Sequence, residues 1–80
     1  MKPEIIKSKF KEILILSLDI HMSDIEEQDT LEYLGADALD IMDVICRIED
    51  KFRIEISDSE KNSLRTVKDY LDFIERKTRG

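Results

Sequence analysis

LGADALDIMDVICRIEDKF, residues 34–52, combines a helix start signal with a long helical repeat of apolar side chains. Asp37 can accept a hydrogen bond from an otherwise unpaired backbone N–H of the first turn, and Gly35 permits a sharp approach to it. The apolar residues that follow recur three or four positions apart. They are Ile41, Ile45, Ile48 and Phe52, with Met42 and Val44 widening the stripe. The pattern predicts an amphipathic helix over residues 37–52.

An earlier helix is predicted over residues 3–17. Pro3 suits a first helical turn, where its missing N–H costs nothing. The apolar positions with helical spacing are Ile6, Phe10, Ile13 and Leu14. The apolar segment 14–18 resembles a strand when taken alone. The continuous helical pattern before it, and the lack of any candidate partner strand, favour a helix.

Two further helices follow from start signals near the C-terminal end of the sequence. Ser57-x-x-Glu60 and Thr66-x-x-Asp69 both have the form of a capping box, in which two residues satisfy each other's backbone N–H groups. They predict a short helix over residues 57–64 and a longer one over residues 66–77. The inward residues of the last helix are expected to be Val67, Tyr70, Leu71 and Ile74.

Residues 19–37 are polar and acidic, and they predict a long connection between the first two helices. Ser23-x-x-Glu26 is another capping-box candidate and predicts one short helical turn. Apolar side chains expected to attach this connection to the core are Ile20, Met22, Ile25 and Leu31. The predicted fold is therefore one domain over residues 1–80: an all-α four-helix bundle with a short third helix.

The charge pattern limits the possible partners. The net charge is −6, and residues 19–60 carry 14 acidic side chains against three basic ones. Such an acidic middle segment repels nucleic acid and favours partners with basic patches. The alternative is a solvated face whose charge only keeps a small protein in solution. No apolar run reaches the roughly 20 residues of a membrane span, and no secretory signal is present. We expect a monomer in the cytoplasm.

No set of side chains points to catalysis or to metal binding. His21 stands alone in a polar segment and is expected on the surface. Cys46 has no thiol partner and is expected to be a small buried apolar residue. Asp37, Asp40 and Asp43 lack the loop spacing of a calcium-binding turn, so we expect no metal site and no enzyme activity.

The run Leu34-Gly35-Ala36-Asp37-Ala38-Leu39-Asp40 resembles the modification site of acyl carrier proteins, in which Gly-x-Asp-Ser-Leu holds the serine that receives 4′-phosphopantetheine. The similarity extends without a gap from Gly35 to Ile74. It implies a cofactor-attachment position at Ala38, flanked by Asp37 and Leu39. The serine itself is absent, and the methyl group of Ala38 has no oxygen that could form a phosphodiester. This chain as written cannot be loaded.

The resemblance implies a function. Such proteins shuttle acyl intermediates as thioesters in fatty-acid, lipid or polyketide-type biosynthesis. Their partners are a phosphopantetheinyl transferase and acyl-processing enzymes, which dock through basic patches. The matching docking positions are Asp40, Met42, Asp43, Arg47, Glu49 and Asp50. An acyl chain would enter an apolar cleft lined by Phe10, Ile45, Ile48, Leu64 and Ile74, although core packing alone would also explain these residues.

Several positions depart from the family pattern. Arg47 stands at a usually small apolar position, Tyr33 replaces an acidic residue, Thr30 a large apolar one and Ser57 a frequent proline. These changes predict a specialised carrier. Two accounts of Ala38 are open. The intact residues around it favour an engineered replacement of a native serine, and the alternative is a natural, non-carrying interaction module that binds partners through the same helix.

Overall fold

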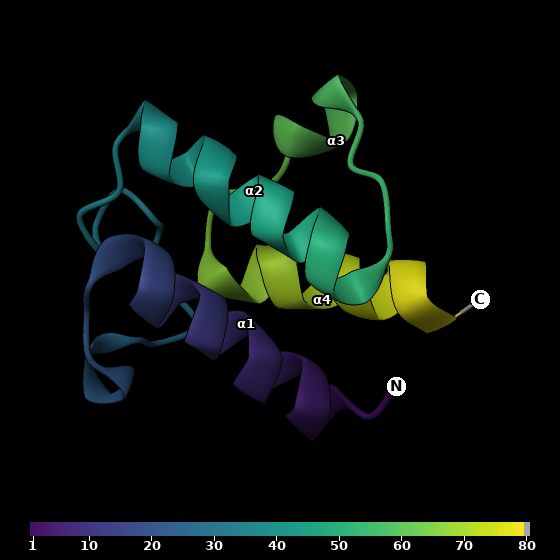
Figure 1. Ribbon diagram of the computed structural model, residues 1–80, viewed down its shortest axis with the longest axis horizontal. Coiled ribbons are helices and arrows are strands. Elements are labelled where there is room, and N and C mark those ends of the chain that lie inside the picture. Colours follow the sequence, from purple (N-terminus) through teal and green to yellow (C-terminus); the bar gives the residue numbers. More distant parts are fainter. Residues whose placement is uncertain (80) are drawn as a thin grey trace.

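The computed structural model describes residues 1–79 of the chain and is all-α over that range (Figure 1). Its elements are α1 (Pro3–Leu18), the 3₁₀ turn η1 (Met22–Asp24), α2 (Ala38–Phe52), α3 (Asp58–Lys61) and α4 (Val67–Arg79). The helix α1 packs against both α2 and α4, while α3 lies at the edge of the bundle. The predicted four-helix bundle with a short third helix and a long first connection is confirmed.

The third helix is shorter than the sequence predicts. The capping box at its start forms as expected, with the Glu60 N–H donating to Ser57 Oγ at 3.2 Å and the Ser57 N–H donating to Glu60 Oε1 at 2.9 Å. The helix ends at Lys61 instead of residue 64. The hydroxyl of Ser63 donates to the carbonyl oxygen of Glu60 at 2.8 Å, and this local bond competes with further helix.

The core confirms most of the predicted inward faces. Phe10 of α1 stacks on Tyr70 of α4 with ring centroids 5.4 Å apart, and both side chains are fully buried. Met42 and Phe73 are among the positions that differ from expectation. Met42 is 63% exposed and does not widen the buried stripe of α2, whereas Phe73, which was not expected inside, is buried on α4. No helix within residues 1–79 is both long enough and apolar enough to span a bilayer.

The long connection supplies hydrogen-bond acceptors to the start of α4. The first N–H groups of a helix have no partner within it. Here the N–H groups of Val67 and Lys68 donate to the carbonyl oxygens of Asp29 and Glu27, at 2.8 and 2.9 Å. The Glu27 carboxylate also pairs with Lys7 of α1 at 2.9 Å. The connection is thus attached to two helices by backbone and side-chain bonds.

Two details of the predicted connection are wrong. Ile25 and Leu31 are buried as expected and Ile20 is half-buried, but Met22 is 46% exposed. The predicted capping box of Ser23 and Glu26 does not form. The turn begins two residues earlier, at Met22 with His21 as its cap, because the Asp24 carboxylate accepts the N–H of His21 at 3.2 Å.

The capping box of α4 forms as predicted and gives a testable stability effect. The Asp69 carboxylate accepts the N–H groups of Thr66 and Arg65, at 3.0 and 3.1 Å. Asp69→Ala should therefore lower the free energy of unfolding by about 1 kcal/mol near neutral pH. Asp72→Ala, on the exposed side of the same helix, should change it by less than about 0.5 kcal/mol.

The same carboxylate makes stability depend on pH. The hydrogen bond from the Thr66 backbone holds the pKa of Asp69 below its ordinary value of 3.8. Its contribution is present above that value and is lost as the pH falls through the lower pKa of the folded state. Urea unfolding at neutral and at acidic pH should show a smaller acid-induced loss for Asp69→Ala than for the parent. An equal loss would contradict this assignment.

Candidate functional site

A tight turn delivers the chain to the start of α2. The Ala36 N–H donates to the carbonyl oxygen of Leu31 at 3.0 Å, and the Ala36 side chain is buried. Gly35 has φ = +102°, a conformation that residues with a Cβ rarely adopt. The glycine therefore fixes the direction from which the chain enters the helix, as the sequence predicts.

The first turn of α2 presents position 38 to solvent. The Asp40 N–H donates to Asp37 Oδ1 at 2.9 Å, and the Asp37 N–H donates to Asp40 Oδ2 at 3.1 Å. This capping box confirms Asp37 as the cap. Ala38 is the first helical residue and is exposed, and Leu39 beside it is 76% exposed. A hydroxyl at this position would be open to an enzyme, whereas the methyl group of Ala38 cannot hold a phosphopantetheine arm.

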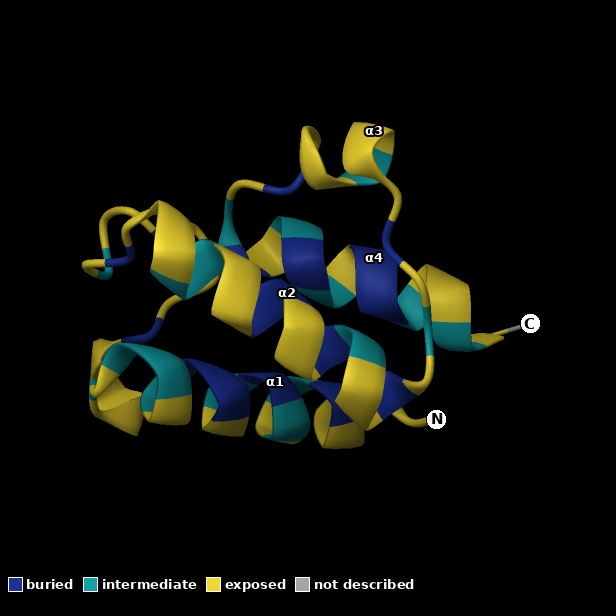
Figure 2. Ribbon diagram, turned by 45° about the horizontal axis from the view of Figure 1, so that its top comes forward, coloured by how far each residue is buried: buried dark blue, intermediate teal, exposed yellow. Residues whose placement is uncertain are grey.

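Exposed residues lie along one side of α2 (Figure 2), and they include both apolar and charged residues. The members of this exposed face are Leu39, Met42, Asp43, Cys46, Arg47 and Asp50. The expectation of a buried Cys46 is wrong, because the buried stripe of α2 is narrow and this residue lies outside it. His21 is exposed in the first connection, as predicted.

The charged residues of α2 have different partners. Asp43 Oδ2 accepts bonds from Ser17 Oγ at 2.7 Å and from Arg47 Nε at 2.9 Å. The Ser17 hydroxyl, followed by the Arg47 guanidinium, holds the pKa of Asp43 below its usual value, so this carboxylate is ionised at neutral pH. Glu49 is half-buried, and its Oε2 accepts the N–H of Ile56 at 2.9 Å. Its carboxylate therefore holds the α2–α3 connection.

A cleft of about 320 Å³ lies between α2, the end of α3 and the start of α4. It begins one helical turn beyond position 38, with Ile41 and Met42. Its lining residues are Glu32, Ile41, Met42, Ile45, Lys61, Asn62, Leu64, Arg65 and Tyr70. Burial, together with the nearby charges of Glu32 and Asp69, raises the pKa of Tyr70 to about 12, so its phenol stays neutral.

This cleft shares only part of its lining with the acyl cleft that the sequence predicts. Ile45 and Leu64 line this cleft, but Phe10, Ile48 and Ile74 have no exposed surface and pack in the closed core. The polar rim formed by Glu32, Lys61 and Arg65 was not expected. These residues come from separate segments, and no spacing in the sequence indicates that they meet.

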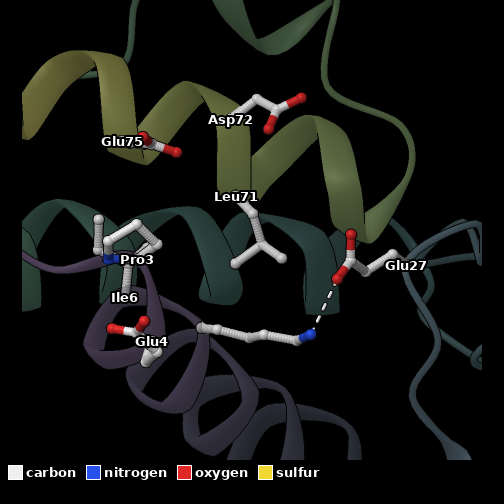
Figure 3. Close-up of a pocket in the computed structure, with 8 residues that line it drawn as sticks. Pro3, Glu4, Ile6, Glu27, Leu71, Asp72 and Glu75 are labelled. Atoms are coloured by element: carbon white, nitrogen blue, oxygen red, sulfur yellow. Dashed lines mark hydrogen bonds and ion pairs between the residues drawn. The ribbon is translucent and has the colours of Figure 1, made fainter.

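A second cleft, of about 270 Å³, lies between α1 and α4 (Figure 3). Leu71 points into it, and Glu27 approaches it from the first connection. Its acidic side chains are largely matched by cations: Glu27 pairs with Lys7, Asp72 with Lys68 at 3.9 Å and Glu75 with Arg79 at 3.0 Å. We assign this cleft a structural role, because its Glu27–Lys7 pair attaches the first connection to α1 and its other two pairs lie within α4.

Comparison with known proteins adds independent information. The phosphopantetheine attachment site family matches residues 8–74. The acyl carrier protein of Buchnera aphidicola (subsp. Acyrthosiphon pisum, strain Tuc7) is 38% identical over 73 residues, covering 90% of this chain and 91% of that protein. The acyl carrier protein of Wolinella succinogenes is 36% identical over 66 residues, covering 81% and 87%. The crystal structure of a Thermotoga maritima acyl carrier protein superposes with a TM-score of 0.83 at 30% identity, covering 99% of this chain and 93% of that one.

Proposed function

The chain belongs to the acyl carrier protein family, and on that premise we propose that residues 1–80 form one non-enzymatic carrier domain that holds acyl groups as thioesters when serine occupies position 38. The cofactor would be 4′-phosphopantetheine. The observation that carries this proposal is the exposed first position of α2, held between the Asp37–Asp40 capping box and an exposed Leu39. The proposed location is the cytoplasm, and the proposed state is a monomer.

We propose further that Ala38 stands in place of a native serine. The positive φ of Gly35, the capping box and the exposed Leu39 are all present around a methyl group that uses none of them. These features together hold an exposed attachment position at a fixed helix start, which is what a carrier with serine at position 38 needs. The alternative is an interaction module that contacts enzymes through α2 and is never loaded.

The cleft beside α2 supports a role in sheltering an acyl chain. Ile41, Ile45 and Leu64 supply an apolar wall, and the opening lies one helical turn from position 38. Sites for apolar ligands combine such walls with a few polar groups at the rim. The acyl group could belong to fatty-acid, lipid or polyketide-type biosynthesis.

Partner enzymes are proposed to dock on α2, through the half-buried Asp40 of its first turn and through Met42, Asp43, Arg47 and Asp50 of its exposed face. Glu49 is proposed to share this role, and its half-buried carboxylate also accepts the Ile56 N–H. Opposite charges across such an interface speed encounter and set register. The basic enzyme surfaces would meet acidic residues beside the exposed Leu39 and Met42, which supply apolar contact area.

The docking proposal predicts that Asp50→Lys slows association with a phosphopantetheinyl transferase. At low salt the association rate should fall on the order of tenfold, because a repulsive charge replaces an attractive one. Added salt should shrink the difference by screening. Asp72→Lys, which makes the same change in an exposed residue of α4, should have little effect. Equal effects of the two substitutions in stopped-flow measurements would contradict docking on α2.

The carrier proposal itself is tested by enzymatic loading of the Ala38→Ser chain, read as a mass increase in intact mass spectrometry. The interaction-module alternative predicts that this chain binds the transferase and remains unmodified.

A further inference from the structure

The exposed face of α2 contains an ion pair between Asp43 and Arg47, and we infer that Arg47 is a selectivity residue of this carrier. By engaging Asp43 and adding a positive charge, Arg47 slows association with enzymes that dock through basic patches alone. It favours an enzyme that places a carboxylate opposite the guanidinium. This inference rests on the proposed function and narrows the kind of partner that the face accepts.

The geometry leaves Asp43 little freedom to meet a basic partner. Its Oδ2 atom accepts both the Ser17 hydroxyl at 2.7 Å and Arg47 Nε at 2.9 Å. The Arg47 and Asp43 side chains are 46% and 48% exposed, so the pair lies on the surface that an enzyme would cover. A lysine or arginine approaching this carboxylate would meet a guanidinium already in place, and like charges at close range repel.

A second base extends the positive charge along the helix. Lys51 lies one turn beyond Arg47, and both line a shallow cleft of about 210 Å³ between α1 and α2. The α1 side of this cleft includes Leu16, which is 69% exposed. Asp50 supplies the remaining charge of α2 at this cleft. The charged residues along α2 are therefore acidic at its start, with Asp40, and of mixed sign toward its end.

The position of the pair distinguishes it from ordinary helix-stabilising pairs. Residues four apart with opposite charges commonly interact on helix surfaces. Arg79 and Glu75 make such a pair on α4, at 3.0 Å. The pair on α2 differs because it adjoins the exposed Leu39 and Met42, and clustered apolar side chains beside charges are a feature of contact surfaces.

The test measures association of the unmodified chain with a holo-synthase-type phosphopantetheinyl transferase that has basic docking residues, by surface plasmon resonance at several salt concentrations. The Ala38 chain suits this measurement because it cannot be modified during it. Arg47→Ala should raise the association rate on the order of three- to tenfold at low salt, and Arg47→Glu should raise it further. Arg47→Lys keeps the charge and should stay near the parent rate.

Arg79→Ala is the matched control, since it removes an arginine of the same pair type and changes the net charge equally on α4. It should change the rate by less than about twofold, because its charge lies off the docking face. Equal association rates for Arg47→Ala and Arg79→Ala would overturn the inference. The absence of measurable binding by the parent and by every variant would overturn it as well. Loading of the serine chain does not enter this experiment, so failure of the carrier proposal would be seen separately.

Discussion

The Ala38→Ser chain should gain one phosphopantetheine group per molecule from coenzyme A and a suitable transferase, whereas the Ala38 chain should gain none. The change is from no product to complete modification, because only the hydroxyl supplies the oxygen that the phosphodiester needs. Position 38 is exposed at the first residue of α2, so an enzyme can reach it without unfolding the helix. Serine should cost at most about 0.5 kcal/mol there, since the Asp37 cap remains.

The parent chain supplies an internal control for this reaction. It already contains Ser57 as the cap at the start of α3, so it tests whether a serine at a helix start is modified outside position 38. The parent must therefore stay unmodified under conditions that load Ala38→Ser. Intact mass spectrometry, followed by peptide mapping to residue 38, reads both results. A serine chain that several transferases leave unmodified would remove the carrier proposal and leave the interaction module.

Helix starts were the features best predicted from the sequence. Asp37, Ser57 and Thr66 each cap a helix within one residue of the expected position, because a cap needs only a side-chain oxygen and a partner three residues away. Ser23 has the same local pattern and fails. There the Asp24 carboxylate accepts the N–H of His21. The Glu26 N–H, which the predicted box would give to Ser23, donates to Asp29 Oδ2. Local chemistry is predictable until two side chains compete for one N–H group.

Residues at the margins of a helical face were predicted less well. Cys46 of α2 and Met22 of the first connection were expected to be buried but are exposed, while Phe73 of α4 was missed inside. Met42 was counted both in the apolar stripe and among the docking positions, and it is exposed. Periodicity gives the direction of a face but not its width, which depends on how closely neighbouring helices approach. Arg76 and Lys77 lie over the Phe73 ring, at 5.7 and 5.5 Å, and help to cover it.

The candidate site also has one part that could be predicted from the sequence and one part that could not. The start of α2 could be read from consecutive residues, and the structure has Asp37 as the predicted cap with Ala38 as the first helical residue. The cleft could not be read in this way, because its rim joins Glu32 of the first connection to Lys61 of α3. The bond from Ser17 to Asp43 joins residues 26 positions apart and has no signal in the sequence. Long-range contacts of this kind require the fold.

Leu14→Ala and Leu16→Ala should have very different effects on stability, although they make the same chemical change two residues apart in α1. Leu14 is fully buried, and its truncation should lower the free energy of unfolding by about 3–4 kcal/mol. Leu16 is 69% exposed, and its truncation should cost less than about 0.5 kcal/mol. The larger loss is a substantial part of the roughly 5–15 kcal/mol that stabilises a typical domain.

This pair of substitutions tests the one segment whose sequence also resembles a strand. In a strand, residues 14 and 16 would point to the same face, so both leucines would be buried or both exposed. In a helix they are separated by about 200° of rotation, and only one can face the core. Urea unfolding followed by far-UV circular dichroism measures the two free energies. Similar losses for both variants would contradict the helical packing of α1 against α2 and α4, since that packing buries Leu14 and leaves Leu16 in solvent.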